Sequence, residues 1–188
     1  MISFTITEKG YGVAPADLER GLKPVLIMGK VTLLLYERFL AGKLPLTVQS
    51  MDNCSNNGDK VKSAVIAYAD RWAQEGLVPG EFLEYVQDPA RVTYPWSMID
   101  KITPRPDEKV QKMLAEDGFE DNYTILTDKR TYTAPFVNAE ETEYLVIEDN
   151  YTNGRPPLEL GGVMYVDRET VDKVERMKVC TCLTPLHT

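Results

Sequence analysis

The chain has 188 residues, 43% of them hydrophobic, enough for one packed domain or one domain and a fraction. Its formal net charge of -8 argues against nucleic-acid binding, which usually needs a basic face to neutralise phosphates. The longest apolar run, near Val31 to Leu35, is bounded by charged residues and is far too short to span a bilayer.

The first half of the chain alternates strand patterns with helix patterns. Alternating or β-branched residues favour strands, and apolar residues spaced three or four apart favour helices. The patterns predict strands at residues 2–7 and 46–50, and helices at 23–41, 57–72 and 81–87. The first helix is apolar around most of its circumference, so we expect it to be buried. Asn57 or Asp59 is the expected cap of the second.

The second half begins with an extended segment at residues 92–99 and a helix at 107–116. Three strands are then predicted at residues 123–126, 144–147 and 163–166, where β-branched or aromatic residues lie between turn residues. A final helix begins at Asp167 or Thr170. We place its apolar face at Val171, Val174 and Met177, which are spaced three residues apart.

Strands that alternate with helices of this length predict an α/β layered sheet. Ligands of such sheets bind beyond the carboxyl ends of the strands. Three polar clusters follow predicted strands, at residues 7–11, 50–53 and 97–101. We therefore expect these clusters to contribute to a ligand site.

Five stretches of the chain carry motifs that recur in one order in a known family. They are Phe-Thr-Ile-Thr-Glu-Lys-Gly-Tyr at 4–11, Ser-Met-Asp-Asn-Cys-Ser-Asn-Asn-Gly at 50–58, Ser-Met-Ile-Asp-Lys-Ile-Thr-Pro at 97–104, Ile-Glu-Asp-Asn-Tyr-Thr-Asn-Gly-Arg-Pro-Pro at 147–157, and the segment 177–187. Together they resemble the polyol-specific long-chain dehydrogenases and reductases, which include mannitol 2-dehydrogenase and the fructuronate and tagaturonate reductases. The resemblance covers nearly the whole chain.

This resemblance implies a metal-independent, NAD-dependent oxidoreductase, with NADP as the alternative cofactor. Its substrate would be a ketose or keto-uronate that is interconverted with its alcohol, of the fructose/mannitol or fructuronate/mannonate type. The sequence Cys-Leu-Thr-Pro-Leu-His-Thr at 182–188 favours the mannonate-forming branch of the family. A catalytically inactive binding or interaction module derived from the same scaffold is the alternative function.

The resemblance also implies a domain organisation. Residues 1–166 would be the carboxyl-terminal half of a Rossmann-like dinucleotide-binding domain, and residues 167–188 would begin an all-α substrate-binding domain. The sequence contains no Gly-x-Gly-x-x-Gly turn, so we expect the cofactor fingerprint to lie upstream. We also expect both ends of the chain to be cut from a longer polypeptide, and the isolated piece to be inactive.

Hydride transfer of this kind needs a base for the hydroxyl proton and donors for the developing alkoxide. Lys178 resembles the base of the family, although by itself it could be an exposed helix lysine held by solvent. Asn53 resembles one of two amides that stabilise the substrate oxygen, because an amide NH2 donates without changing charge. An Asx-turn role for Asn53 is the alternative, and both roles can hold together.

Two further catalytic residues follow from the resemblance. His187, the only histidine, resembles the family histidine that binds or orients the substrate oxygen. Thr184 stands where the family places the second asparagine, so one donor is shorter here. Nine positions separate Lys178 from His187, which puts them on opposite sides of an ideal helix at about 100° per residue. We expect a π-bulge near Thr181 or a break at Pro185 to bring them together.

Lys9 and Asp100 resemble cofactor-binding residues of the family, with Asp100 and Lys101 as its Asp-Arg pair. A surface ion pair is the alternative role for Asp100 and Lys101. We interpret the turn around Arg155 as mainly structural, because its glycine and prolines suit a fixed backbone, and a ligand contact by Arg155 is the alternative.

The cysteines predict neither a disulfide framework nor a metal site. Cys180 and Cys182 lack both the two-residue spacing and the second pair of a usual zinc site, so we expect packing cysteines. No apolar secretion signal precedes Cys54, and a reducing cytoplasm is the expected compartment. The partners we expect are a small sugar acid or polyol and the missing parts of the same polypeptide.

Overall fold

The computed structural model describes residues 1–101, 103–141 and 143–183, and its contacts divide the chain into two compact units. Unit 1 comprises Met1–Ile99 and Leu145–Thr188, and unit 2 comprises Asp100–Tyr144. Among the described residues, no helix is both long and apolar enough to cross a membrane.

A parallel sheet lies at the centre of the first part of unit 1. Its order is β1 (Ile2–Phe4), β2 (Leu46–Ser50) and β3 (Val92–Thr93), and all five residues of β2 are buried. Parallel neighbours need crossover connections. One crossover contains η1 (Glu8–Tyr11), α1 (Pro15–Leu18) and α2 (Ile27–Leu40), and the other contains α3 (Asn57–Gln74) and α4 (Gly80–Gln87). The predicted α/β alternation is therefore confirmed.

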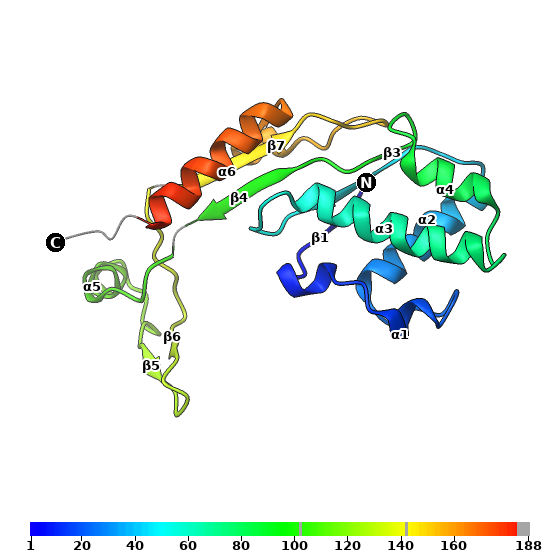
Figure 1. The fold of residues 1–188 in the computed structure, drawn as a ribbon. Helices are drawn as coiled ribbons and strands as arrows, with labels where there is room; N and C mark the ends of the chain where they lie inside the picture. The colour runs from blue at the N-terminus through cyan, green and yellow to red at the C-terminus, as the bar shows by residue number, and fades with distance from the viewer. Residues whose placement is uncertain (102, 142, 184–188) are drawn as a thin grey trace. The chain divides into compact units, whose positions relative to one another are not determined.

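Helices α2, α3 and α4 pack together beside this sheet and form the core (Figure 1). Trp72, Phe82 and Leu35 are fully buried there. Helix α2 begins at Ile27, later than predicted, because Val25 and Leu26 donate their backbone N–H groups to the Asp17 carboxylate at 2.8 and 3.2 Å. The expectation that α2 is buried holds only for one face, which includes Met28 and Leu35, since Leu34 and Leu40 are exposed.

A second sheet has the order β4 (Ser97–Lys101), β7 (Glu143–Glu148) and β8 (Met164–Val166), with β7 and β8 parallel. The predicted extended segment 92–99 is thus two strands in two sheets. Tyr94, Pro95 and Trp96 separate them, and Pro95 has no N–H to continue a ladder. The third polar cluster, 97–101, consequently forms β4 itself and does not follow a strand as predicted.

Unit 2 contains helix α5 (Glu108–Glu116) and a hairpin of β5 (Ile125–Leu126) and β6 (Tyr132–Thr133). Helix α5 begins as predicted, because the Asp107 side chain accepts from the backbone N–H of Lys109 at 2.8 Å. Strand β6 was not predicted, since only two residues pair and their pattern is too short to signal a strand.

The last elements return to unit 1. The 3-10 helix η2 (Leu158–Gly161) precedes β8, and α6 (Arg168–Leu183) follows it. Asp167 caps α6 by accepting from the backbone N–H of Thr170 at 2.7 Å, which confirms the predicted start. The predicted apolar face is wrong: Val171 is fully buried, but Met177 is 62% exposed. The domain boundary at residue 166 stays a prediction.

Candidate functional site

The carboxyl ends of β1 and β2 bring the first two polar clusters together. The two strands pair in register, with Phe4 opposite Ser50, so the residues that follow them leave the sheet at the same edge. The backbone N–H of Met51 donates to the Phe4 carbonyl at 2.9 Å and extends this pairing. The prediction that these clusters meet at a strand end is confirmed for residues 7–11 and 50–53.

The Asp52 carboxylate is the centre of this edge. It accepts from the backbone N–H of Ile6 at 2.9 Å and of Thr7 at 2.8 Å. The Tyr11 hydroxyl donates to the same carboxylate at 2.5 Å and also contacts the Ser50 hydroxyl. Burial and the bond to Asp52 raise the pKa of Tyr11, which therefore stays a protonated donor. The network fixes the loop after β1 to the loop after β2.

The start of α3 is joined to β4 through Asn57. Its buried side-chain nitrogen lies 2.9 Å from the Asp52 carbonyl and from both the carbonyl and hydroxyl oxygens of Ser97. Its side-chain oxygen accepts from the Ser97 backbone N–H at 3.0 Å. Next to it, a Cβ on Gly58 would lie 2.3 Å from the Tyr94 carbonyl oxygen, so only glycine allows this approach.

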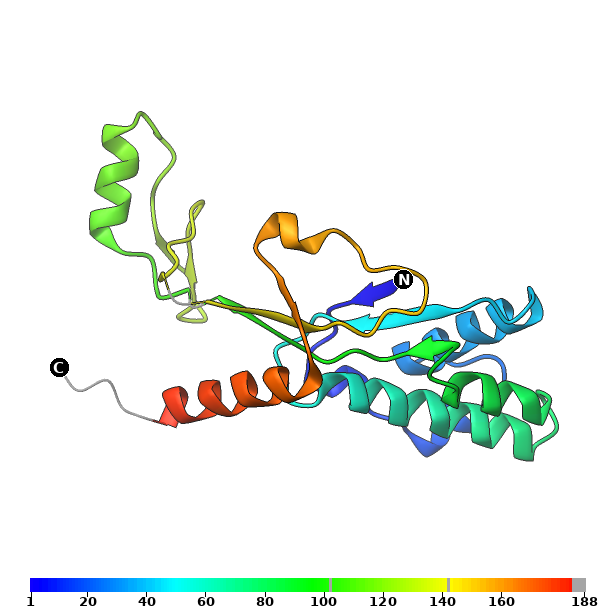
Figure 2. The same cartoon turned by 90° about the horizontal axis from the view of Figure 1, so that it is seen from above.

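Helix α6 is attached to the same region by charged and buried side chains. Arg168 donates to both carboxylate oxygens of Glu148, at 3.1 and 3.0 Å, and to Asp59 of α3 at 3.2 Å. The guanidinium also lies 4.9 Å from the centre of the Trp96 ring. Figure 2 shows α6, coloured from orange to red, starting beside the N-terminal end of α3, where Arg168 contacts Asp59.

The third turn of α6 places a buried carboxylate against α3. Both carboxylate oxygens of Glu175 accept from the backbone N–H of Asn56 at 3.2 Å, and Glu175 is only 3% exposed. Burial raises the pKa of Glu175, although the Asn56 N–H opposes the shift. This contact fixes the rotation of α6 one turn before Lys178.

Lys178 and Asn53 meet in this structure. The Lys178 Nζ donates a hydrogen bond to the Asn53 side-chain oxygen, so residues 125 positions apart form one polar pair. Asn53 is exposed and Lys178 is half-buried. Because the amide oxygen faces the lysine, the amide NH2 is left to donate elsewhere. The pair thus presents an amine and an amide donor side by side.

The other predicted site residues have different outcomes. Lys9 lies exposed on η1, and Asp100 lies on β4 in unit 2. His187 and Thr184 are outside the described residues. Helix α6 is α-helical through Leu183, so the π-bulge expected near Thr181 does not occur. Pro185, the alternative break, is also outside the described residues.

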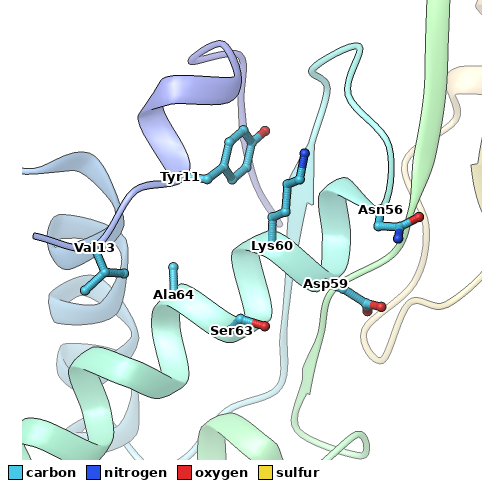
Figure 3. A pocket seen from close by; sticks show the side chains of 7 residues that line it. All are labelled: Tyr11, Val13, Asn56, Asp59, Lys60, Ser63 and Ala64. Atoms are coloured by element: carbon cyan, nitrogen blue, oxygen red, sulfur yellow. The ribbon is translucent and has the colours of Figure 1, made fainter.

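A cavity of about 460 Å³ lies between η1 and α3 (Figure 3). Tyr11, Val13 and Ala64 contribute to its lining. Its Lys60 pairs with Glu8 at 2.7 Å, and its Asp59 pairs with Arg168 at 3.2 Å. Both charged side chains of the cavity are thus held in ion pairs within the protein. We therefore place the candidate site at Asn53 and Lys178 and not in this cavity.

Several residues of the site were missed from the sequence. Asp52 stood inside a predicted polar cluster, but nothing in the pattern separated its buried carboxylate from exposed neighbours. Glu175 and Arg168 were given no role, because they stand among the other charged residues of the last helix. Arg155, read as part of a structural turn, pairs with Asp149 at 2.6 Å and lies over the Tyr165 ring at 4.5 Å.

The relatives of the chain are oxidoreductases. It is 48% identical to a D-mannonate oxidoreductase of Thermotoga maritima, over 100% of this chain and 37% of the relative. It is 33% identical to a mannitol dehydrogenase of Saccharomyces cerevisiae, over 95% of this chain and 34% of the relative. The chain therefore spans little more than a third of the length of these relatives.

Solved structures and a family model agree with these relatives. A D-sorbitol dehydrogenase matches with a TM-score of 0.62 and 30% identity, over 89% of this chain and 34% of that one. A Pseudomonas fluorescens mannitol 2-dehydrogenase, in a ternary complex with NAD and D-mannitol, matches with a TM-score of 0.60 and 26% identity, over 95% and 35%. The model of the mannitol dehydrogenase Rossmann domain matches residues 3–160. The chain belongs to the mannitol dehydrogenase family, and its residues 3–160 match the Rossmann domain of that family.

Proposed function

We propose that the full-length protein is a NAD-dependent oxidoreductase that interconverts fructuronate and mannonate by hydride transfer. The preference for a uronate over a ketose is supported by the relative from Thermotoga maritima, which is a D-mannonate oxidoreductase and shares more residues with this chain than the yeast mannitol dehydrogenase does. Fructose and mannitol are the second substrate pair.

The hydrogen bond between Lys178 and Asn53 is the observation that carries this proposal. In the oxidation direction, the Lys178 amine would take the proton of the substrate hydroxyl, and the carbon that bears this hydroxyl would give its hydride to the oxidised nicotinamide. The Asn53 NH2 donates to the oxygen as its negative charge develops. The bond between the two side chains keeps both groups near one substrate oxygen. His187 and Thr184 are proposed as further donors to that oxygen, on the family resemblance.

The nicotinamide cofactor accepts or supplies the hydride when it is bound. The edge formed by parallel β1 and β2 is the kind of place where α/β proteins bind such groups, so the residues fit a cofactor that reaches this edge. We assign cofactor contacts to Lys9 and Asp100, again on the resemblance. The sequence has no glycine-rich phosphate-binding turn, and we propose that this turn lies upstream.

The domain assignment follows from the same proposal. Residues 1–166 complete a Rossmann-like domain from its carboxyl-terminal side, and residues 167–188 open the helical domain that covers the substrate. A chain with neither the phosphate-binding turn nor the covering domain should not turn over substrate by itself. We propose a cytoplasmic enzyme, because the three cysteines follow no disulfide framework.

Two variants of the full-length protein test the roles at the site. Lys178→Ala removes the base, and we expect NADH oxidation with fructuronate to fall by about 10²–10⁴-fold. Asn53→Ala removes one oxyanion donor and should lower kcat by about 10²–10³-fold. Lys173→Ala is the matched control, because Lys173 lies on the same helix in an exposed pair with Glu169. This control should stay within about twofold of the wild type.

The outcomes separate the candidate functions. If the Lys178→Ala variant turns over substrate at the wild-type rate, Lys178 is not the general base. Reduction of fructose but not fructuronate would move the substrate to the polyol branch. A wild-type protein that binds NADH without turning over either substrate would instead favour the inactive module, for which Thr184 in place of asparagine is the motivating change.

A further inference from the structure

Two buried carboxylates in unit 1 have nearly the same surroundings. Asp52 accepts from the backbone N–H groups of Ile6 and Thr7 and from the Tyr11 hydroxyl. Asp17 accepts from two consecutive backbone N–H groups as well, and from the Tyr68 hydroxyl at 2.6 Å. Asp52 is 4% exposed and Asp17 is 5% exposed. The two carboxylates differ in the backbone segment that each one binds.

Asp17 holds a helix start that is remote from the site. Its two N–H donors, Val25 and Leu26, immediately precede α2, so the carboxylate acts as a cap supplied from the preceding helix. Backbone angles there are ordinary, with Leu26 at φ -70° and ψ 151°. The role of Asp17 is thus to stabilise the fold.

Asp52 instead holds a turn with a strained backbone. Thr7 has φ 64° and ψ 163°, a region that only glycine normally occupies. The Thr7 N–H donates to Asp52 at 2.8 Å, and the Thr7 carbonyl accepts from Gly10 at 3.0 Å. Strained residues persist where surrounding contacts over-determine them, and they cluster at functional sites.

The backbone of Asp52 is fixed as firmly as its side chain. Its N–H donates to the Ser50 hydroxyl at 3.2 Å, and its carbonyl accepts from the Asn57 side chain and from the Cys54 N–H, both at 2.9 Å. Asn53 is the next residue, and its exposed side chain reaches Lys178 from this fixed point. The direction of the Asn53 amide therefore depends on Asp52.

We propose that Asp52 is a positioning residue for catalysis, which holds the strained Thr7 turn and aims the Asn53 amide at Lys178 and at the substrate oxygen. This inference rests on the proposed function. Small misplacements of catalytic groups have large effects on rate, so the loss of this support should slow the reaction and not merely weaken the fold.

The experiment compares Asp52→Asn with Asp17→Asn in the full-length protein. Both changes keep the side-chain shape but replace an acceptor oxygen by an NH2 group that cannot accept a backbone N–H. Both variants should show lowered melting temperatures of similar size. Asp52→Asn should also lower kcat by about 100-fold with KM changed by less than about threefold, whereas Asp17→Asn should keep the wild-type kcat. Equal kcat values in the two variants would overturn the proposal.

A second measurement does not need turnover. Reductive methylation followed by peptide mass spectrometry gives the labelling rate of Lys178 relative to that of exposed Lys173. This ratio should rise in Asp52→Asn, because a misdirected Asn53 no longer engages the Lys178 amine, and it should stay at the wild-type value in Asp17→Asn. An unchanged ratio in Asp52→Asn refutes the positioning role.

The two measurements separate this inference from the proposed function. A wild-type protein without turnover on any keto sugar contradicts the function, while the labelling ratio still decides whether Asp52 directs Asn53. If Asp52→Asn does not fold, Tyr11→Phe with Tyr68→Phe as its control gives the same contrast, since each removes one donor to the carboxylate. Tyr11→Phe should raise the labelling ratio, Tyr68→Phe should not, and equal ratios would overturn the proposal.

Discussion

At Gly58 the start of α3 approaches the backbone between β3 and β4 too closely for a side chain to fit without a shift. A Cβ added there would lie 2.3 Å from the Tyr94 carbonyl oxygen and 2.8 Å from the Pro95 carbonyl oxygen. Ordinary C···O contacts are no closer than about 3.3 Å, so α3 would have to move by about 1 Å from the segment between β3 and β4. Both obstacles are backbone atoms, and no rotamer change can relieve the clash.

The magnitude follows from two opposing terms. Overpacking a site of this kind costs about 1–3 kcal/mol, and backbone obstacles place Gly58→Ala at the upper end of that range. The higher helix propensity of alanine returns about 1 kcal/mol. A net loss of about 2 kcal/mol corresponds to a melting temperature lowered by roughly 4–8 °C in a domain of this size.

Thermal unfolding of the full-length protein measures this loss. Gly80→Ala is the matched control, because Gly80 also lies in the first turn of a helix, and a Cβ there would meet no atom within 4 Å. We expect Gly80→Ala to leave the melting temperature unchanged or to raise it slightly. A melting temperature for Gly58→Ala equal to that of Gly80→Ala would refute the reasoning about the close approach.

Two further predictions concern charges on α6. Glu175→Gln should raise the melting temperature at pH 7. Burial raises the pKa of Glu175 in the folded protein above its ordinary value of 4.5, so the wild type loses stability as the pH rises from 4.5 through the raised pKa. In a series of melting curves at different pH values, the difference in melting temperature between variant and wild type should therefore vanish at acid pH. Arg168→Met leaves the buried Glu148 carboxylate without its guanidinium partner, and urea titration should show a loss of about 1–3 kcal/mol. Arg71→Met, which breaks the exposed pair with Glu75, should cost less than about 0.5 kcal/mol in the same titration.

The sequence predicted those features that depend on local patterns. Strand β2 and helices α3 and α4 lie close to their predicted bounds, because turn residues end them and their apolar spacing is regular. The first two polar clusters met at a strand end for a general reason, since parallel neighbours leave their carboxyl ends at one edge. The structure pairs Asn53 with Lys178, while the catalytic roles that the family resemblance suggests for them stay predictions.

Features that depend on distant contacts could not be predicted. The break between β3 and β4 sends residues 97–101 into a second sheet, and that destination is set by the pairing with β7. Asp52 and Asp17 look alike in sequence, each an acidic residue among polar or helical neighbours. Only the folded chain shows that one caps a helix while the other holds a strained turn beside Asn53.

The buried face of α6 was predicted wrongly because a spacing of three residues is shorter than one helical turn. Residues spaced by three fall behind the helical turn by about 60° at each step, so Met177 is rotated by roughly 120° from Val171 and is exposed. A step of four residues followed by a step of three covers almost two full turns, so residues with this spacing stay on one face of the helix. They align Val171 with Glu175 and Lys178, and the first two of these are buried against the rest of unit 1. Lys178 therefore reaches Asn53 because it continues the packed face of α6, and its placement needs no bulge in the helix.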